Sequence, residues 1–208
     1  MMIAAIIDIV ASRKVSTRQR KELDRKLRSL LSGLYQRFQK HCLAQPALTQ
    51  GDSIELLVDG WQPIVFIFHS LLMADQEFRV GLGTGEVTIQ KENADECDGP
   101  AFWNAREALD EIKQMKYMSR SAAFNIDENS SVTESRIVIE SILFLTTLLG
   151  LTRIQLEHCY HFIWEKKSIS EIAETVETSK GNVSRSLSKT PCYLLERVMA
   201  YLSSSRGP

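Results

Sequence analysis

The chain changes character near residue 127, and this change constrains its fold more than any other feature. Before that point, short apolar runs alternate with longer segments of helical periodicity, beginning with the β-branched run Ile3–Val10 and the apolar stripe of residues 16–41. After that point, every segment has the apolar spacing of a helix. We therefore expect an α+β domain over residues 1–127 and an all-helical domain over residues 128–208.

Charge and length limit the classes of function. The 208 residues carry 25 lysines and arginines against 26 aspartates and glutamates, so the formal net charge is −1. This balance excludes a chain that coats nucleic acid with positive charge over its whole surface, although it allows a local basic face. The 44% of apolar residues is enough to build a core in a domain of more than about 100 residues.

The pattern predicts no membrane partner. The longest apolar stretch is interrupted by Glu140 and falls short of the roughly 18 residues that a spanning helix needs. The apolar start contains Asp8 and has no basic residues before it, so we interpret it as a buried strand rather than a signal peptide. The four cysteines are widely spaced and form no C-x-x-C pair. We expect free thiols and a cytoplasmic protein.

The first domain is expected to alternate strands and helices. Glycines between Phe78 and Ile89 favour a pair of strands there, and Pro100 opens a helix at a position where its missing N–H costs nothing. The expected strands are Ile3–Val10, Ala47–Gln50, Ile54–Val58, Phe78–Leu82, Glu86–Ile89 and Ser121–Ile126, and the expected helices are residues 16–41, Trp61–Met73 and Ala101–Met118.

The second domain contains the pattern of a helix-turn-helix at about residues 151–190. A short helix over Ile169–Val176 and another over Gly181–Leu187 flank a turn at Glu177–Ser179. Two helices that cross steeply need a small residue where their backbones approach each other, and Ala173 stands at that place. Residues 150–208 carry eight lysines and arginines against six aspartates and glutamates, and the basic residues concentrate after Thr178.

The second helix of this motif is expected to bind double-stranded DNA. Its N-terminus can meet a phosphate, and asparagine and arginine side chains can pair with base edges. The candidate DNA-binding residues are Ser179, Lys180, Asn182, Ser184, Arg185 and Lys189. A helix-turn-helix that binds protein and a plain helical scaffold are the alternatives.

About 40 residues of this region resemble the helix-turn-helix of sigma-factor region four and of related response regulators. The resemblance is carried by four short stretches, Leu151-Thr152, Gln155, Glu171-Ile172-Ala173 and Asn182-Val183-Ser184-Arg185. It implies that the last of these stretches belongs to a helix that reads DNA.

Two aspartates and one arginine predict a polar site in the first domain. Asp8 interrupts an apolar strand, where a carboxylate is costly unless it is paired or binds a cation. Asp52 follows Gly51 in a turn, and two carboxylates that meet repel each other unless a divalent metal lies between them. Arg106 lies on the helix that opens at Gly99, where it could neutralise a phosphoryl group. Each residue alone also fits an ordinary structural role.

The order of these residues resembles the catalytic domain of class III nucleotide cyclases. The matching stretches are Ile6-Ile7-Asp8-Ile9-Val10, Gly51-Asp52, the run from Arg79 to Val87, and Ala105-Arg106. The resemblance implies a palm-like, ferredoxin-like βαββαβ fold in which Asp8, Asp52 and the carbonyl of Ile9 bind Mg²⁺ or Mn²⁺. It further implies a catalytic Arg106, nucleotide phosphates held by Ser12, Arg13 and Lys14, and a homodimer.

Two departures from the cyclase pattern leave a nucleotide site without turnover as an alternative. Phe102 stands where the cyclases have an asparagine, and Leu48-Thr49 occupies the region of their base-selecting lysine. Residues 12–40 carry ten lysines and arginines against two acidic residues, which indicates either a solvated basic face or a surface for nucleic-acid backbone.

The chain resembles the SatD family of bacterial proteins more closely, over most of residues 1–120. The stretches that carry this resemblance run from Asp8 to Lys14, from Gln50 to Asp52, from Arg79 to Glu86 and from Asp98 to Ala108. The role of that family is poorly defined, so the resemblance says more about fold than about activity.

Together these patterns predict a DNA-binding regulator in which the first domain binds metal and nucleotide. The first alternative is an active metal-dependent nucleotide cyclase or nucleotidyltransferase, in which a ribose 3′-hydroxyl attacks a 5′-phosphate and releases pyrophosphate. The second alternative is a protein-interaction module without catalysis.

Overall fold

The computed structural model describes residues 2–10, 16–49, 52–115 and 120–203. The chain separates into two compact units, Met1–Leu143 and Phe144–Pro208. The division between these units falls within a helix, so it does not test where a domain boundary lies. The boundary at residue 127 therefore stays a prediction. The predicted phosphate-binding residues Ser12, Arg13 and Lys14 lie outside the described residues.

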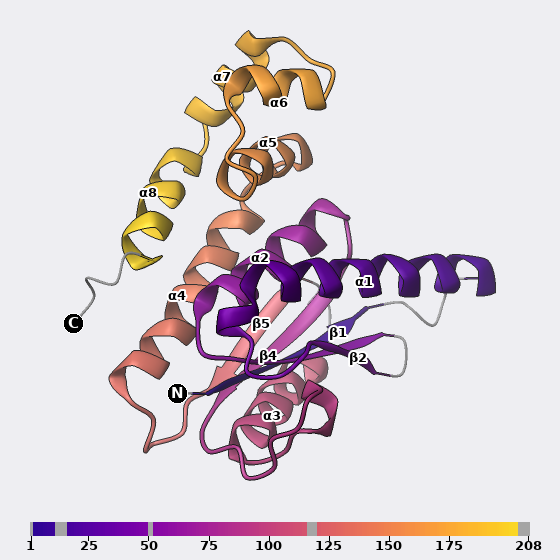
Figure 1. Ribbon diagram of the computed structural model, residues 1–208, viewed down its shortest axis with the longest axis vertical. Coiled ribbons are helices and arrows are strands. Elements are labelled where there is room, and N and C mark those ends of the chain that lie inside the picture. Colours follow the sequence, from indigo (N-terminus) through magenta and orange to yellow (C-terminus); the bar gives the residue numbers. More distant parts are fainter. Residues whose placement is uncertain (1, 11–15, 50–51, 116–119, 204–208) are drawn as a thin grey trace. The chain divides into compact units, whose positions relative to one another are not determined.

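A five-stranded mixed sheet forms the centre of the first unit (Figure 1). Its strands are β1 (Ile3–Ile9), β2 (Ala47–Thr49), β3 (Ser53–Val58), β4 (Phe78–Thr84) and β5 (Ser121–Asn125). The order across the sheet is β2-β3-β1-β4-β5, with β4 and β5 parallel and the other neighbours antiparallel. The first strand of the chain therefore lies at the centre of the sheet.

Helices cover both faces of this sheet, which gives the mixed α and β architecture that the sequence predicts. Helices α1 (Thr17–Phe38) and α2 (Trp61–Met73) lie on one face, and α3 (Pro100–Gln114) lies on the other (Figure 1). Two single turns of 3₁₀-helix, η2 (Gln39–His41) and η3 (Ala94–Glu96), connect these elements.

The sequence explains why β1 is central and why α1 is helical. A central strand must be apolar on both faces, and Ile3, Ile7 and their neighbours in β1 are buried except at Asp8. Ser16 caps α1 in a capping box with Gln19. The apolar stripe of α1 is buried at Leu27, Leu31 and Leu34, which confirms the periodicity read from the sequence.

The expected strand at Glu86–Ile89 is wrong. In this stretch only Ile89 forms a β-bridge, an isolated one with Asp98. Gly85 has a φ of 139°, which turns the chain out of β4. The carbonyl of Glu86 then accepts a hydrogen bond from the backbone N–H of Ala101 at 3.1 Å. The stretch therefore supports the start of α3 instead of extending the sheet.

The second unit is helical. Helix α4 (Val132–Leu149) contains the division between the units, and α5 (Arg153–Ile163), α6 (Ile169–Thr175), α7 (Lys180–Ser188) and α8 (Cys192–Ser203) follow it. Its buried core includes Leu156 and Ile163 of α5 and Leu195 of α8. Among the described residues, no helix combines the length and the apolar character needed to cross a membrane.

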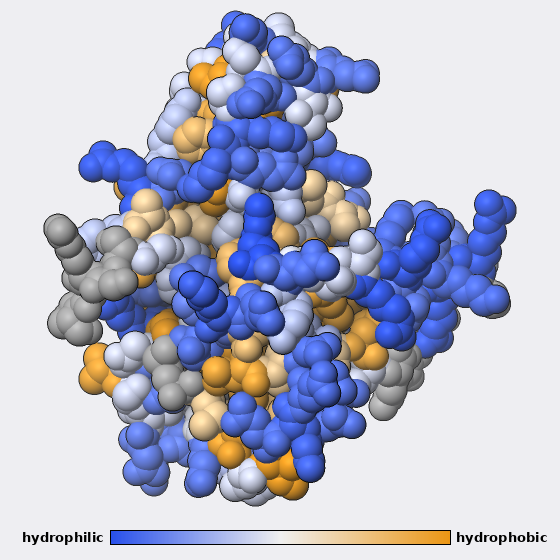
Figure 2. All heavy atoms as spheres, in the orientation of Figure 1, coloured by the Kyte–Doolittle hydropathy of each residue, from blue (hydrophilic) through white to orange (hydrophobic). Residues whose placement is uncertain are grey.

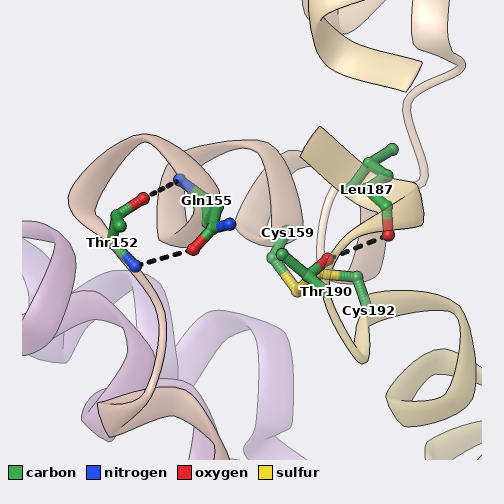
Figure 3. The surroundings of a disulfide bond; sticks show 6 residues. All are labelled: Thr152, Gln155, Cys159, Leu187, Thr190 and Cys192. Carbon is green, nitrogen blue, oxygen red and sulfur yellow. Dashed lines mark hydrogen bonds between the residues drawn. A yellow bond between two sulfur atoms is a disulfide. The ribbon is translucent and has the colours of Figure 1, made fainter. Parts of the chain in front are cut away.

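One cysteine pair corrects the expectation of free thiols. Cys159 of α5 and Cys192 at the start of α8 form a disulfide, with Cα atoms 5.6 Å apart (Figure 3). The sequence did not indicate this pair, because its two cysteines are 33 positions apart and only the packing of α5 against α8 brings them together. Cys42 and Cys97 are free.

Candidate functional site

The ends of β1 and β3 bring the two predicted metal-binding aspartates side by side along the backbone. Asp8 lies opposite Ser53 in the antiparallel register, and the N–H of Ile9 donates to the carbonyl of Asp52 at 2.9 Å. Asp52 is buried, with 8% of its surface exposed, and Asp8 is half-buried. Residues 44 positions apart in the sequence are thus neighbours at one end of the sheet.

The charged residues around Asp8 include an arginine that the sequence did not predict there. Arg79 of β4 lies directly opposite Asp8 on the other side of β1, and directly opposed residues of antiparallel strands share a face. Within the described residues, no group of three or more His, Cys, Asp and Glu side chains is placed to hold a metal ion. Two carboxylates and the Ile9 carbonyl are oxygen donors of the kind that Mg²⁺ prefers, with water or substrate oxygens completing its six ligands.

Arg106, the predicted catalytic residue, is held by two carboxylates. Its Nη1 donates to Oδ1 of Asp98 at 3.2 Å, and its Nη2 lies 4.0 Å from Oε2 of Glu55. Its guanidinium also lies over the ring of Phe102, 5.9 Å from the centroid. Burial raises the pKa of Asp98, but hydrogen bonds from the Gly99 backbone, Arg106 and Trp103 outweigh it and lower the pKa.

Glu55 is the residue of this region that the sequence reading missed. It lies opposite Ile6 in the β1–β3 pair. Ile6 is two residues before Asp8, so Ile6, Asp8 and Glu55 share one face of the sheet. The side chain of Glu55 is only 13% exposed, and its Oε2 has no hydrogen-bond partner. Burial raises the pKa of Glu55, although Arg106 lowers it. The signal was available, because Glu55 interrupts an apolar strand just as Asp8 does.

In the second unit, α6 and α7 pack through a small apolar seam. Ile172 and Ala173 of α6 and Val183 and Leu187 of α7 are buried, at the positions that the sequence predicts for a shared core. The carbonyl of Ala173 accepts a hydrogen bond from the N–H of Thr178 at 2.9 Å, so the turn closes directly against the small residue.

The opposite side of α7 is polar and open to solvent. The turn before it passes through Glu177, which has a φ of 51°, and Ser179 caps the helix by accepting from the N–H of Asn182 at 3.2 Å. Arg185 donates from Nη2 to Oδ1 of Asn182 at 2.6 Å. Of the six predicted DNA-binding residues, only Ser184 is half-buried, and the others are exposed: Ser179, Lys180, Asn182, Arg185 and Lys189.

A family model for SatD matches residues 2–197 of the chain. The chain belongs to the SatD family. The match covers the sheet and nearly all of the helical unit. Asp8, Asp52 and the α6–α7 helix pair of this SatD-family protein therefore all lie within the matched residues. No curated protein matches the sequence.

Helix α1 of this SatD-family protein presents the basic face predicted from its composition. Figure 2 shows hydrophilic side chains gathered over the outer part of α1, where Arg18, Lys21 and Arg25 are exposed. Part of the charge is neutralised within the helix, because Lys26 pairs with Glu22 at 2.8 Å and an Arg28–Asp24 pair follows at 2.9 Å.

Proposed function

We propose that this SatD-family protein is a DNA-binding regulator and that α7 is the helix that enters the major groove. The observation that carries the proposal is the division of α7 into two sides. On one side, Val183 and Leu187 are buried in the core of the unit. On the other, Asn182, Arg185 and Lys189 are exposed to solvent. A helix with this division can be inserted into a groove without loss of its own packing.

The chemistry of the exposed side suits duplex DNA. Arginine can form two parallel hydrogen bonds to guanine, and asparagine can do the same to adenine. Lys180, the first residue of α7, and Lys189, directly after its last residue, would contact phosphates on either side of the groove. Each phosphate contact releases counterions, so binding should weaken steeply as salt rises.

Duplex selection followed by fluorescence polarisation tests this proposal. A random duplex library is enriched on the full chain, and the affinity for the enriched sequence is measured at several salt concentrations. We expect Arg185→Ala to weaken binding by about 1–3 kcal/mol and to relax the preference at one base pair. Arg197→Ala is the matched control, because Arg197 is an exposed arginine of the same unit on α8.

Two results would overturn the proposal. One is the absence of any enriched duplex at low salt. The other is an equal loss of affinity in Arg185→Ala and Arg197→Ala, which would indicate attraction to positive charge in general rather than reading by α7.

A second candidate function concerns the first unit, which we propose binds a nucleotide through a divalent metal. Its support is the adjacency of Asp8 and Asp52 through the Ile9 hydrogen bond. These residues and the Ile9 carbonyl would hold Mg²⁺ or Mn²⁺, which when bound neutralises phosphate charge. The pairing of Arg106 with Asp98 means that a phosphate must compete with a carboxylate for the guanidinium.

Thermal-shift measurements with nucleoside triphosphates and MgCl₂ test this second function. A ligand that binds only the folded state raises the melting temperature, and we expect Asp8→Asn and Asp52→Asn to remove that rise. Asp110→Asn, which alters an exposed aspartate of α3, should keep it. A rise that persists in both Asn variants would contradict the site.

Two further measurements separate the alternatives for this unit. Pyrophosphate release that is lost in Asp52→Asn would indicate a cyclase or nucleotidyltransferase rather than a regulatory site. Light scattering tests the homodimer that the cyclase resemblance implies. Binding of neither nucleotide nor DNA would leave the protein-interaction module.

A further inference from the structure

Helix α1 carries a line of positive charge that neither proposed function uses. Arg18, Lys21 and Arg25 follow one another at spacings of three and four residues, so they lie on one stripe of the helix. All three residues are exposed. The stripe spans about 10 Å, because each residue of a helix rises about 1.5 Å. These three residues are called the basic stripe below.

The charge of the basic stripe is not neutralised within the helix. Glu22 and Asp24 are the only acidic residues in the sequence from 16 to 41. Glu22 pairs with Lys26 at 2.8 Å, and Asp24 pairs with Arg28 at 2.9 Å. Both carboxylates are therefore occupied by other cations, while the like charges of the basic stripe repel each other at their spacing.

The basic stripe also begins at the end of the helix where positive charge is least favourable. The N-terminus of a helix carries a partial positive charge, so acidic residues stabilise it and basic residues destabilise it. The first turn of α1 has no acidic residue, and Arg18, Arg20 and Lys21 lie within the first five residues of the helix. Local arrangements that cost stability are expected at functional sites. A polyanion against the stripe would offset this cost.

The basic end of α1 is solvated rather than packed. Every residue from Arg18 to Glu22 is exposed, and five consecutive residues make more than one full turn. In the view of Figure 1, this end of α1 extends beyond the strands of the sheet. A large ligand can therefore reach the basic stripe without displacing a buried side chain of α1.

The other sides of α1 narrow the class of polyanion. Leu27, Leu31 and Leu34 are buried, and Leu23 and Leu30 are half-buried, so the helix has no apolar face left to insert into a lipid surface. The basic stripe also has no aromatic or aliphatic anchor of the kind on which protein interfaces depend. A surface that offers positive charge alone fits the phosphate backbone of a nucleic acid.

We propose that the basic stripe binds the phosphate backbone of duplex DNA without regard to sequence. A duplex carries one negative charge for about every 1.7 Å of its axis, so the stripe can meet several phosphates. The choice of duplex DNA rests on the proposed function of α7, which belongs to the other unit. The basic stripe then supplies affinity, and α7 supplies selectivity.

The salt dependence of binding to a duplex of random sequence tests the inference on the full chain. Each lost phosphate contact makes the plot of log affinity against log salt less steep by about 0.9. We expect Arg18→Gln/Arg25→Gln to reduce the slope by roughly 1.8 and to weaken binding to every duplex alike. Lys91→Gln/Lys113→Gln removes the same charge from exposed lysines of the same unit and should leave the slope unchanged.

Thermal unfolding without DNA checks that a loss of binding is not a loss of structure. Glutamine is a good helix former, and removal of Arg18 relieves the unfavourable charge at the N-terminus of α1. The double glutamine variant of the stripe should therefore melt no lower than the parent. A lower melting temperature would contradict the argument from the helix dipole.

Two results would overturn the inference. One is an unchanged slope in Arg18→Gln/Arg25→Gln. If that variant instead loses binding to double-stranded RNA, or to vesicles of phosphatidylserine and phosphatidylcholine, the stripe serves that other polyanion. The second result is an equal change of slope in the lysine control, which would indicate attraction to positive charge in general.

Failure of the proposed function would look different. In that case Arg185→Ala would have no effect and no base pair would be preferred, while the slope would still depend on the basic stripe. A preserved sequence preference with a slope that ignores the basic stripe would remove only the present inference.

Discussion

At the residue scale, the carboxylate of Glu55 makes the free energy of unfolding depend on pH. Its Oε2 lies 4.0 Å from Nη2 of Arg106 and has no hydrogen bond. Because burial raises the pKa of Glu55 above the ordinary 4.5, the folded chain holds that proton more tightly than the unfolded chain does. The free energy of unfolding therefore falls as pH rises from about 4.5 through the folded pKa.

Glu55→Gln should remove this dependence on pH. We expect the variant to be more stable than the parent at pH 7 and to lose that advantage as the pH falls below about 4.5, where the parent glutamate is protonated. Denaturant unfolding at a series of pH values measures the difference. Glu111→Gln, at an exposed position of α3, is the control.

A lower stability of Glu55→Gln at pH 7 would contradict this interpretation. It would mean that the attraction between Glu55 and Arg106, 4.0 Å apart, outweighs the cost of burying the carboxylate.

The sequence predicted part of this arrangement. Asp8 was recognisable because it interrupts an apolar strand, and Asp52 because it follows a glycine in a turn. Their backbone adjacency agrees with the expectation that the two positions meet. The partners of Arg106 were not predictable, since Glu55 and Asp98 reach it only after α3 has packed on the sheet.

At the element scale, the contact between α3 and β4 depends on two glycines. A Cβ added at Gly81 would lie 1.9 Å from the carbonyl oxygen of Ala105, and one at Gly83 would lie 2.2 Å from that of Ala101. Both clashes are with backbone atoms, which cannot rotate away. Glycine is therefore needed for the helix to approach the strand this closely.

Gly83→Ala should destabilise the first unit by about 3 kcal/mol or more, because α3 must move away from the sheet. Gly33→Ala is a matched change with the opposite expected sign. Gly33 is in α1 with no atom near the added methyl group, and alanine favours a helix interior by roughly 0.5–1 kcal/mol over glycine. Urea unfolding compares the two variants with the parent, and equal effects would refute the account.

Most elements followed from periodicity and caps, because those signals are local. The helix over Trp61–Met73 has the predicted ends, and α1 begins at Thr17, one residue after the predicted start. The strand predicted at Glu86–Ile89 is wrong although apolar residues do alternate there, because Gly85 and the start of α3 redirect the backbone. A local pattern does not contain that competition.

At the scale of the whole molecule, the disulfide belongs to one unit only. Cys159 and Cys192 both lie in the second unit, Phe144–Pro208. A bond that closes a loop of this length restricts the unfolded chain and contributes about 3–4 kcal/mol in the chain-entropy model. Its effect on stability should therefore be confined to α5–α8.

Reduction with dithiothreitol should lower the melting temperature of one calorimetric transition and leave the other unchanged. Mass spectrometry after alkylation should find two accessible thiols in the denatured parent before reduction and four after it. Cys192→Ala should reproduce the loss of stability without reductant. A single transition, or equal shifts in two transitions, would contradict the independence of the units.

Pairings over long distances in the chain were the least predictable feature at this scale. The order β2-β3-β1-β4-β5 and the Cys159–Cys192 bond both depend on which elements pack together. Spacing in the sequence indicated separate cysteines, and only the packing of α5 against α8 reveals the pair.

The central position of β1 has a consequence for biosynthesis. Strand β1 leaves the ribosome before its partners β3 and β4, whose pairing residues follow it by some 45 to 80 positions. Contacts between such distant residues form slowly. During translation an uncovered β-branched segment is thus exposed to other nascent chains, and its assembly is completed only when Phe78–Thr84 has emerged.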